Sequence, residues 1–181
     1  MKQIVRILNL LYIGALFLAK ILFALMVLII FTNVVLRYVF NSGLRWSEEV
    51  SLVFLVWFAF ISIALGVKQD LHIGLHLVNE ESLPPLVNRI LHILDYAVKG
   101  VVGVIMMVYG RILIAFTLRS ILPATHWPAG VLYLILPLAG FFITVESLMG
   151  LLGIPTEQEA VESVLEGRMT IREYLQGVFH A

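Results

Sequence analysis

The chain carries a short charged stretch, RWSEE at residues 45–49, between two strongly apolar runs. Carboxylates and guanidinium groups in such a place form ion pairs and helix caps. Ser47 is predicted to cap a following helix by accepting a backbone hydrogen bond, and Glu48 and Glu49 then occupy the first turn, where the helix dipole favours anions. Arg37, near the end of the preceding run, must reach water or a carboxylate. We therefore predict that Arg37 pairs with Glu48 or Glu49 and fastens the two segments together.

Two more charged residues, Lys99 and Glu146, lie inside later apolar runs. Counted from the middle of the intervening loop at 119–127, they lie at nearly equal distances backward and forward, so helices rising about 1.5 Å per residue place them at the same level. Two arrangements are open: Lys99 and Glu146 pair with each other, or the long side chain of Lys99 extends to the inner headgroups. Asp95 stands four residues before Lys99, which also favours an ion pair along one helix face.

The composition identifies the environment of these charges. Hydrophobic residues make up 61% of the 181 residues and charged residues only 13%, which is too little polar surface for a soluble domain. Four apolar runs are long enough to cross a bilayer core of about 30 Å as helices, and none alternates as a barrel strand does. The fold class is therefore predicted to be an all-α membrane protein with four transmembrane helices, at about 16–36, 50–67, 96–118 and 128–152.

The remaining charges and the tryptophans are placed by this arrangement. Lys20 is expected near the level of Lys99, with its long side chain extended to the headgroups. Arg111 has no obvious partner in the chain, so it either extends towards the membrane surface or meets another chain. Trp46 and Trp127 are expected in the aromatic belt on one side of the membrane.

The distribution of Lys and Arg favours both termini on the cytoplasmic side. The apolar N-terminal run continues too far for a cleaved signal peptide, so it is expected to be retained.

After the second span, an amphipathic segment is expected on the inner membrane surface, and Pro84 and Pro85 open a helix that leads into the third span. Two capping boxes predict a cytoplasmic helical tail over 154–181.

The sequence lacks the residues that several kinds of functional site need. The chain has no cysteine and no net charge, which argues against thiolate metal sites, disulfides and nucleic-acid binding. His72 and His76 have the spacing of half a metal site, but no third ligand is apparent. Haem ligation needs histidines facing each other inside the bundle, whereas His92 and His126 are expected on opposite sides of the membrane. No metal, cofactor or catalytic residue is therefore predicted.

The chain carries five short motifs: RYVF (37–40), WSEE (46–49), VW (56–57), KQDLHIG (68–74) and PAGVLYLILP (128–137). Taken together, they resemble the small membrane subunit (DctQ-like) of tripartite ATP-independent periplasmic (TRAP) transporters. The resemblance covers about residues 15–153.

The resemblance implies a division of labour in a bacterial inner membrane. A periplasmic substrate-binding protein (DctP-like) captures an organic acid, a large multi-span subunit (DctM-like) moves it with sodium, and the small subunit acts as a scaffold without binding substrate. Small residues at 100, 103, 110, 139 and 140 offer close helix contacts, either within the chain or with that partner. Only Pro137 interrupts a span, whereas a secondary transporter usually shows paired broken helices. The alternatives are a self-contained homo-oligomeric channel or small exporter, and a membrane enzyme or redox subunit.

Overall fold

The computed structural model describes residues 2–68 and 85–153. The predicted amphipathic segment after the second span, with His72 and His76, and the predicted helical tail at 154–181 lie outside the described residues.

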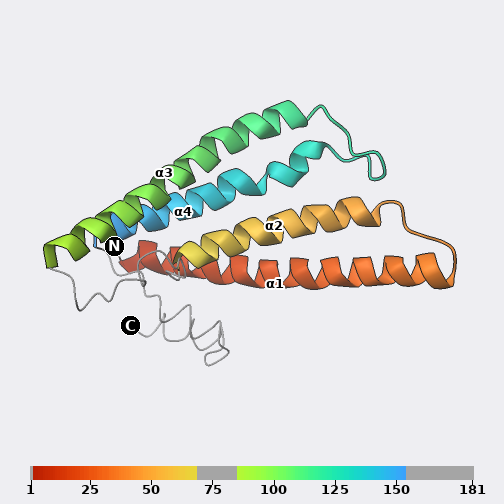
Figure 1. The fold of residues 1–181 in the computed structure, drawn as a ribbon, viewed down its shortest axis with the longest axis horizontal. Helices are drawn as coiled ribbons and strands as arrows, with labels where there is room; N and C mark the ends of the chain where they lie inside the picture. The colour runs from red at the N-terminus through yellow and green to blue at the C-terminus, as the bar shows by residue number, and fades with distance from the viewer. Residues whose placement is uncertain (1, 69–84, 154–181) are drawn as a thin grey trace, which may run out of the picture.

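Four long helices form the described part of the chain (Figure 1). All four are long and apolar enough to cross a membrane when η2 is counted with α4, which confirms the predicted all-α fold with four transmembrane helices. The elements are α1 (Lys2–Val39), α2 (Ser47–Lys68), α3 (Pro85–Thr117), the short 3₁₀ helix η2 (Ala129–Tyr133) and α4 (Ile135–Leu151).

Two helices extend well beyond their predicted spans. α1 begins at Lys2, and α3 begins at Pro85, one of the two prolines predicted to open a helix that leads into the third span. Hydropathy detects only the lipid-crossing part of a helix, whereas the helix itself continues until a residue breaks it. The irregular point of the fourth span lies at Leu134, between η2 and α4. Pro137 falls in the first turn of α4, where its missing N–H removes no helical hydrogen bond, so it does not break the helix.

The helices form two antiparallel pairs that join through α2 and α4 (Figure 1). α1 packs along α2, α3 packs along α4, and α2 contacts α4. The turn at residues 40–46 and the loop at residues 118–128 lie at one end of the bundle, here called the hairpin end. The start of α1 and the last residues of α2 and α4 lie at the opposite end, here called the terminal end.

The α3–α4 contact depends on two glycines. A Cβ atom on Gly103 would lie 2.9 Å from the Gly140 carbonyl oxygen, and one on Gly140 would lie 2.6 Å from the Gly103 carbonyl oxygen. The two backbones therefore touch directly, as small residues allow in membrane helices. These glycines serve packing inside the chain, and so does Ala139, which is buried against Ala64 and Val67 of α2.

At the hairpin end, two asparagines shape the turn between α1 and α2. Asn41 takes a left-handed conformation (φ 50°), which asparagine tolerates better than most residues and which ends a helix. The Asn33 side-chain oxygen accepts a hydrogen bond from the Leu44 N–H at 2.8 Å. The turn thus holds the start of α2 beside the last two turns of α1.

Candidate functional site: polar residues at the two ends of the bundle

A buried polar group at the terminal end joins three helices. Asn9 and Tyr12 come from α1, Lys68 from α2 and Glu146 from α4, and these four residues are here called the terminal cluster. Lys68 Nζ donates a hydrogen bond to Asn9 Oδ1 at 2.9 Å and lies 3.6 Å from Glu146 Oε2. The same ammonium lies 4.3 Å from the centre of the Tyr12 ring, and the Tyr12 hydroxyl donates to the Phe142 carbonyl at 3.0 Å.

All four residues of the terminal cluster are nearly inaccessible, with exposed fractions between 0 and 5%. A charge removed from water is tolerated only where an opposite charge and hydrogen bonds replace its hydration. The cluster supplies a carboxylate, an amide oxygen and an aromatic face around one ammonium. Because these groups come from three helices, the cluster holds α1, α2 and α4 in one relative position.

The ion pairs of the described residues differ in part from those expected. Lys68, rather than Lys99, is the lysine beside Glu146, so the arrangement in which Lys99 pairs with Glu146 is wrong. Lys99 pairs with Asp95 one turn earlier, which confirms the favourable spacing seen in the sequence. Lys68 was not expected beside Glu146 because the predicted second span ends at residue 67, one position before it. The same counting of levels, applied to the second span, brings Lys68 to the depth of Glu146.

At the hairpin end, Glu49 binds the loop between α3 and η2. Its two carboxylate oxygens accept hydrogen bonds from the backbone N–H groups of Ala124 and Thr125, both at 2.8 Å, and from the Thr125 hydroxyl at 2.7 Å. A second link lies deeper, where the Trp57 indole N–H donates to the Val131 carbonyl at 3.0 Å. The first half of α2 is thereby attached to the α3–α4 pair.

The expected roles of Ser47 and Glu49 need correction. Ser47 is already the first residue of α2, and its hydroxyl donates to the Leu44 carbonyl at 2.7 Å instead of capping the helix. The Trp46 carbonyl accepts the first helical hydrogen bond, from the Val50 N–H at 3.1 Å. Glu48 and Glu49 do occupy the first turn, as predicted. The predicted Arg37–Glu49 pair is wrong, because the Glu49 carboxylate is taken by the loop.

Arg37 and Glu48 line the same cavity between α1 and α2, but no ion pair joins them in the part of the chain that the structure describes. Both side chains are exposed. The hairpin therefore brings the two charges to one place, as predicted, without bonding them to each other.

Lys20 occupies an unexpected depth. On α1, Asn9 is level with Lys68, the last residue of α2, and Asn33 is level with Leu44, just before its first residue. α2 itself is about 33 Å long, the thickness of a bilayer core. Lys20 lies eleven residues after Asn9 and thirteen before Asn33, so it is near the middle, about 16 Å from the level of Lys68. The expectation that it lies at the level of Lys99 is wrong, because α1 extends further towards the terminal end than its hydropathy indicates.

The Lys20 side chain is exposed on the surface of α1, and its ammonium lies 5.6 Å from the centre of the Phe17 ring. Arg111 is likewise exposed on α3, six residues before the end of that helix. Neither makes an ion pair with another residue of the described ranges 2–68 and 85–153. Trp46 and Trp127 are both partly exposed at the hairpin end, 41% and 45%, where an aromatic belt would have them.

Between the two ends, the described core is apolar. The largest buried cluster joins α1, α2 and α4 through Leu16, Ala19, Leu22, Ile61, Leu65 and Ile135, with Tyr12 at its border. The buried polar side chains of the described residues lie towards the two ends of the bundle, with Ser47 and Ser51 near the hairpin end and Asn9, Lys68, Lys99, Glu146 and Ser147 near the terminal end. Within the same residues, no group of three or more histidines and carboxylates gathers in the way a metal site requires.

Comparison with known proteins agrees with this architecture. The family model described as "Tripartite ATP-independent periplasmic transporters, DctQ component" matches residues 26–154, more than half of the chain. The match begins after Asn9, Tyr12 and Lys20, so one side of the terminal cluster lies outside it.

Individual relatives carry similar descriptions. A putative TRAP transporter small permease protein of Haemophilus influenzae is 31% identical over 122 residues, which cover 67% of this chain and 74% of the relative. A second putative TRAP transporter small permease protein of the same organism is 30% identical over 129 residues, covering 69% and 77%. The C4-dicarboxylate TRAP transporter small permease protein DctQ of Vibrio cholerae is 37% identical over 49 residues, covering 27% and 21%.

Proposed function

Because this chain belongs to the DctQ component family of the tripartite ATP-independent periplasmic (TRAP) transporters, we propose that it is the scaffold on which a large membrane subunit carries out transport. The family is one of transporter subunits in membranes rather than a class of enzymes. In the proposed assembly, the large subunit moves an organic acid with sodium, and a periplasmic binding protein delivers that acid. This chain itself binds neither the acid nor the sodium.

The position of Lys20 carries the proposal. A lysine at the middle of a transmembrane helix destabilises membrane insertion by about 2.5–3.5 kcal/mol on insertion scales. Lys20 is exposed there and has no carboxylate from the described residues beside it. Its distance from either end of α2 exceeds the length of a lysine side chain, so extending to the headgroups does not fully remove the cost of placing its charge in lipid. A neighbouring membrane protein that presents a carboxylate or backbone carbonyls to α1 would compensate that charge.

Arg111, on α3, also supports contact with a neighbouring membrane protein. It is exposed on α3 about 9 Å from the end of the helix at Thr117, within reach of the membrane surface or of a partner. The hairpin end, with Trp46 and Trp127, is proposed to face the periplasm, with both termini in the cytoplasm of a bacterial cell and the chain in its inner membrane. The Lys and Arg distribution supports that orientation.

A self-contained channel or small exporter is the alternative. It needs a polar path across the membrane, either inside one bundle or between copies. The described core between the two ends of the bundle is apolar, which favours the scaffold. A homo-oligomer that lines a pore with the Lys20 faces of several copies would be the version of this alternative most compatible with the geometry.

Two measurements on the full-length chain test the proposal. A tagged copy is purified from bacterial membranes in mild detergent, and its companions are identified by mass spectrometry. The purified chain is also reconstituted alone in liposomes, and solute flux is followed. We expect a multi-span TRAP large subunit to co-purify and the liposomes to show no flux. Flux from the chain alone would support the channel and overturn the scaffold.

A further inference from the structure

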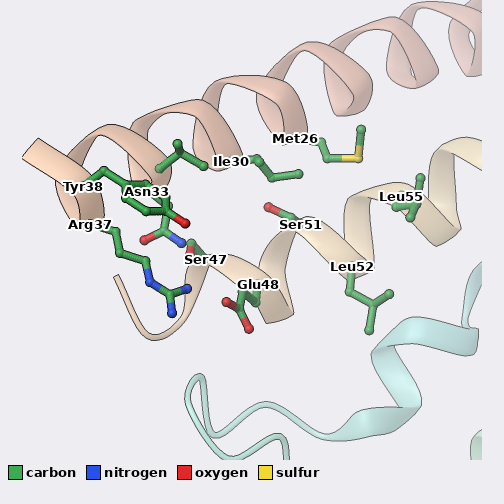
Figure 2. Close-up of a pocket in the computed structure, with 11 residues that line it drawn as sticks. Met26, Ile30, Asn33, Arg37, Tyr38, Ser47, Glu48, Ser51, Leu52 and Leu55 are labelled. Carbon is green, nitrogen blue, oxygen red and sulfur yellow. The ribbon is translucent and has the colours of Figure 1, made fainter. Parts of the chain in front are cut away.

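A cavity of about 420 Å³ lies between α1 and α2 near the hairpin end, and it is here called the hairpin cleft. Figure 2 shows Arg37 and Glu48 beside the turn, with Met26 and Leu55 further along the two helices. The volume is in the usual range for sites that hold small molecules. The cleft belongs to neither the terminal cluster nor the Glu49 contact, and the scaffold role does not use it.

The lining of the hairpin cleft changes character along the membrane normal. Its charged residues stand at the hairpin end, whereas Met26, Ile30, Leu52 and Leu55 line it towards the middle of the bundle. Met26 precedes Arg37 by eleven residues of helix, which corresponds to about 16 Å. An occupant that satisfies both ends must be an amphiphile with its polar group at the hairpin end and its hydrocarbon directed inward.

The charged end offers one group of each sign. Arg37 and Glu48 both face the cleft without pairing to each other. A guanidinium matches the geometry of a phosphate through two parallel hydrogen bonds, and a carboxylate accepts hydrogen bonds from an ammonium group. A second cavity of about 550 Å³ touches the same two residues on the side of the turn and is also lined by Arg45. It provides room for a headgroup beyond the bundle surface.

A third group points to an occupant. The Ser51 side chain is directed from α2 into the hairpin cleft (Figure 2) and is 95% buried, since its exposed fraction is 5%. Its hydroxyl has no hydrogen-bond partner among the described residues. A buried hydroxyl without a partner is destabilising, and Ser51 lies one turn deeper than the charges. An ester oxygen of a bound lipid would reach this level and accept its hydrogen bond.

We propose that the hairpin cleft binds a phospholipid with an amine-bearing zwitterionic headgroup from the leaflet at the hairpin end. Its phosphate binds Arg37, its ammonium binds Glu48, and one acyl chain lies along Met26, Leu52 and Leu55. Glu48 selects this headgroup over an anionic one without an amine, because only the amine-bearing headgroup adds an ammonium group that pairs with its carboxylate.

The proposal is tested on the full-length chain, extracted together with any membrane subunit that it retains and stripped of lipid by washing. Phosphatidylethanolamine or phosphatidylglycerol with identical acyl chains is added, and the lipid that remains bound is measured by native mass spectrometry. One additional charge-assisted hydrogen bond corresponds to about a tenfold preference. We expect the unmodified chain to retain about ten times more of the ethanolamine lipid.

The variants separate the two charges. Glu48→Gln should lower ethanolamine-lipid retention to the level of the glycerol lipid and leave the latter unchanged. Arg37→Gln should lower retention of both lipids. Retention by Arg37→Lys should lie between that of Arg37→Gln and that of the unmodified chain, because lysine keeps the charge without the two parallel hydrogen bonds of a guanidinium. Arg119→Gln, at an exposed arginine of the loop at residues 118–128 that lines neither cavity, is the matched control and should change neither. Equal retention of both lipids by the unmodified chain would overturn the proposal.

A second measurement needs no substitution. An ethanolamine lipid with a photoreactive group on its acyl chain should label peptides containing Met26, Leu52 or Leu55 well above other lipid-exposed peptides. Labelling spread evenly over α1 and α3 would mean ordinary surrounding lipid and would overturn the site. Displacement by millimolar inorganic phosphate would indicate an anion site instead, and loss of labelling when the large subunit is present would mean that a protein segment occupies the cleft.

Discussion

Lys68 and Glu146 lie 3.6 Å apart with side chains that are 2% and 6% exposed, although 78 positions separate them in the chain. The pair connects α2 to α4 at the terminal end, and Asn9 of α1 completes it. Breaking a buried ion pair by removing one partner leaves the other charge buried without its counter-ion, whereas removing both charges does not.

Glu146→Gln should therefore destabilise the protein strongly, by about 3–5 kcal/mol. The double variant Lys68→Met with Glu146→Met should recover much of the loss. Thermal unfolding in detergent, monitored by size-exclusion chromatography, measures the stability of the single and the double variant. Glu48→Gln is the matched control, because the Glu48 side chain is exposed and makes no ion pair among the described residues, and surface substitutions of this kind change stability by about 0.5 kcal/mol or less. An equal effect of the two single variants would contradict a special role for the terminal cluster.

Glu49→Ala should release the loop at 118–128. The N–H groups of Ala124 and Thr125 both donate to this carboxylate, and hydrogen bonds to a charged group contribute about 1.5–3 kcal/mol each. Hydrogen–deuterium exchange of the loop peptide should become markedly faster. Glu48→Ala changes the neighbouring carboxylate, which makes no such bonds among the described residues, and exchange in the loop should stay as it is. Unchanged exchange in Glu49→Ala would show that the loop is held by other contacts.

Gly103→Val should separate α3 from α4, since even a Cβ atom at this position meets the Gly140 carbonyl oxygen at 2.9 Å. Overpacking of this kind destabilises by about 1–3 kcal/mol or more. Gly14→Ala is the opposite case, because a Cβ at Gly14 has nothing within 4 Å, and alanine favours a helix over glycine by about 1 kcal/mol. The melting temperature should fall for the first variant and stay equal or rise for the second. A similar fall in both would argue against the close backbone contact.

Lys20→Met should leave the isolated chain as stable as before, or more stable, because it removes a charge from the middle of α1. Retention of the large subunit through purification should nevertheless decrease, since the ammonium is proposed to bind that partner. Lys20→Arg keeps the charge, so this variant should still retain the large subunit through purification. Leu25→Met, another exposed position of α1, controls for the change of surface. Full retention by Lys20→Met would remove Lys20 from the proposed interface while leaving the scaffold role open to the co-purification test.

The sequence was sufficient for the number of spans, their helical nature and the family. Continuous apolar runs of bilayer length allow hardly any other structure, because backbone groups in lipid must be satisfied within the helix itself. Local relationships were also readable. The Asp95–Lys99 pair and the acidic first turn of α2 follow from spacing along one helix.

The partners of the buried charges were decided by the tertiary structure. Glu146 meets Lys68 rather than Lys99 because α4 contacts α2 on one face and α3 on another, and hydropathy does not indicate which face a polar side chain occupies. Glu49 binds a loop 75 residues away, although Arg37 is much closer in sequence. The depth of Lys20 likewise depends on the axial position of α1 relative to α2, which is determined by the contacts of Asn9 and Asn33. Span number is a property of single helices in lipid, whereas charge pairing is a property of how those helices are packed.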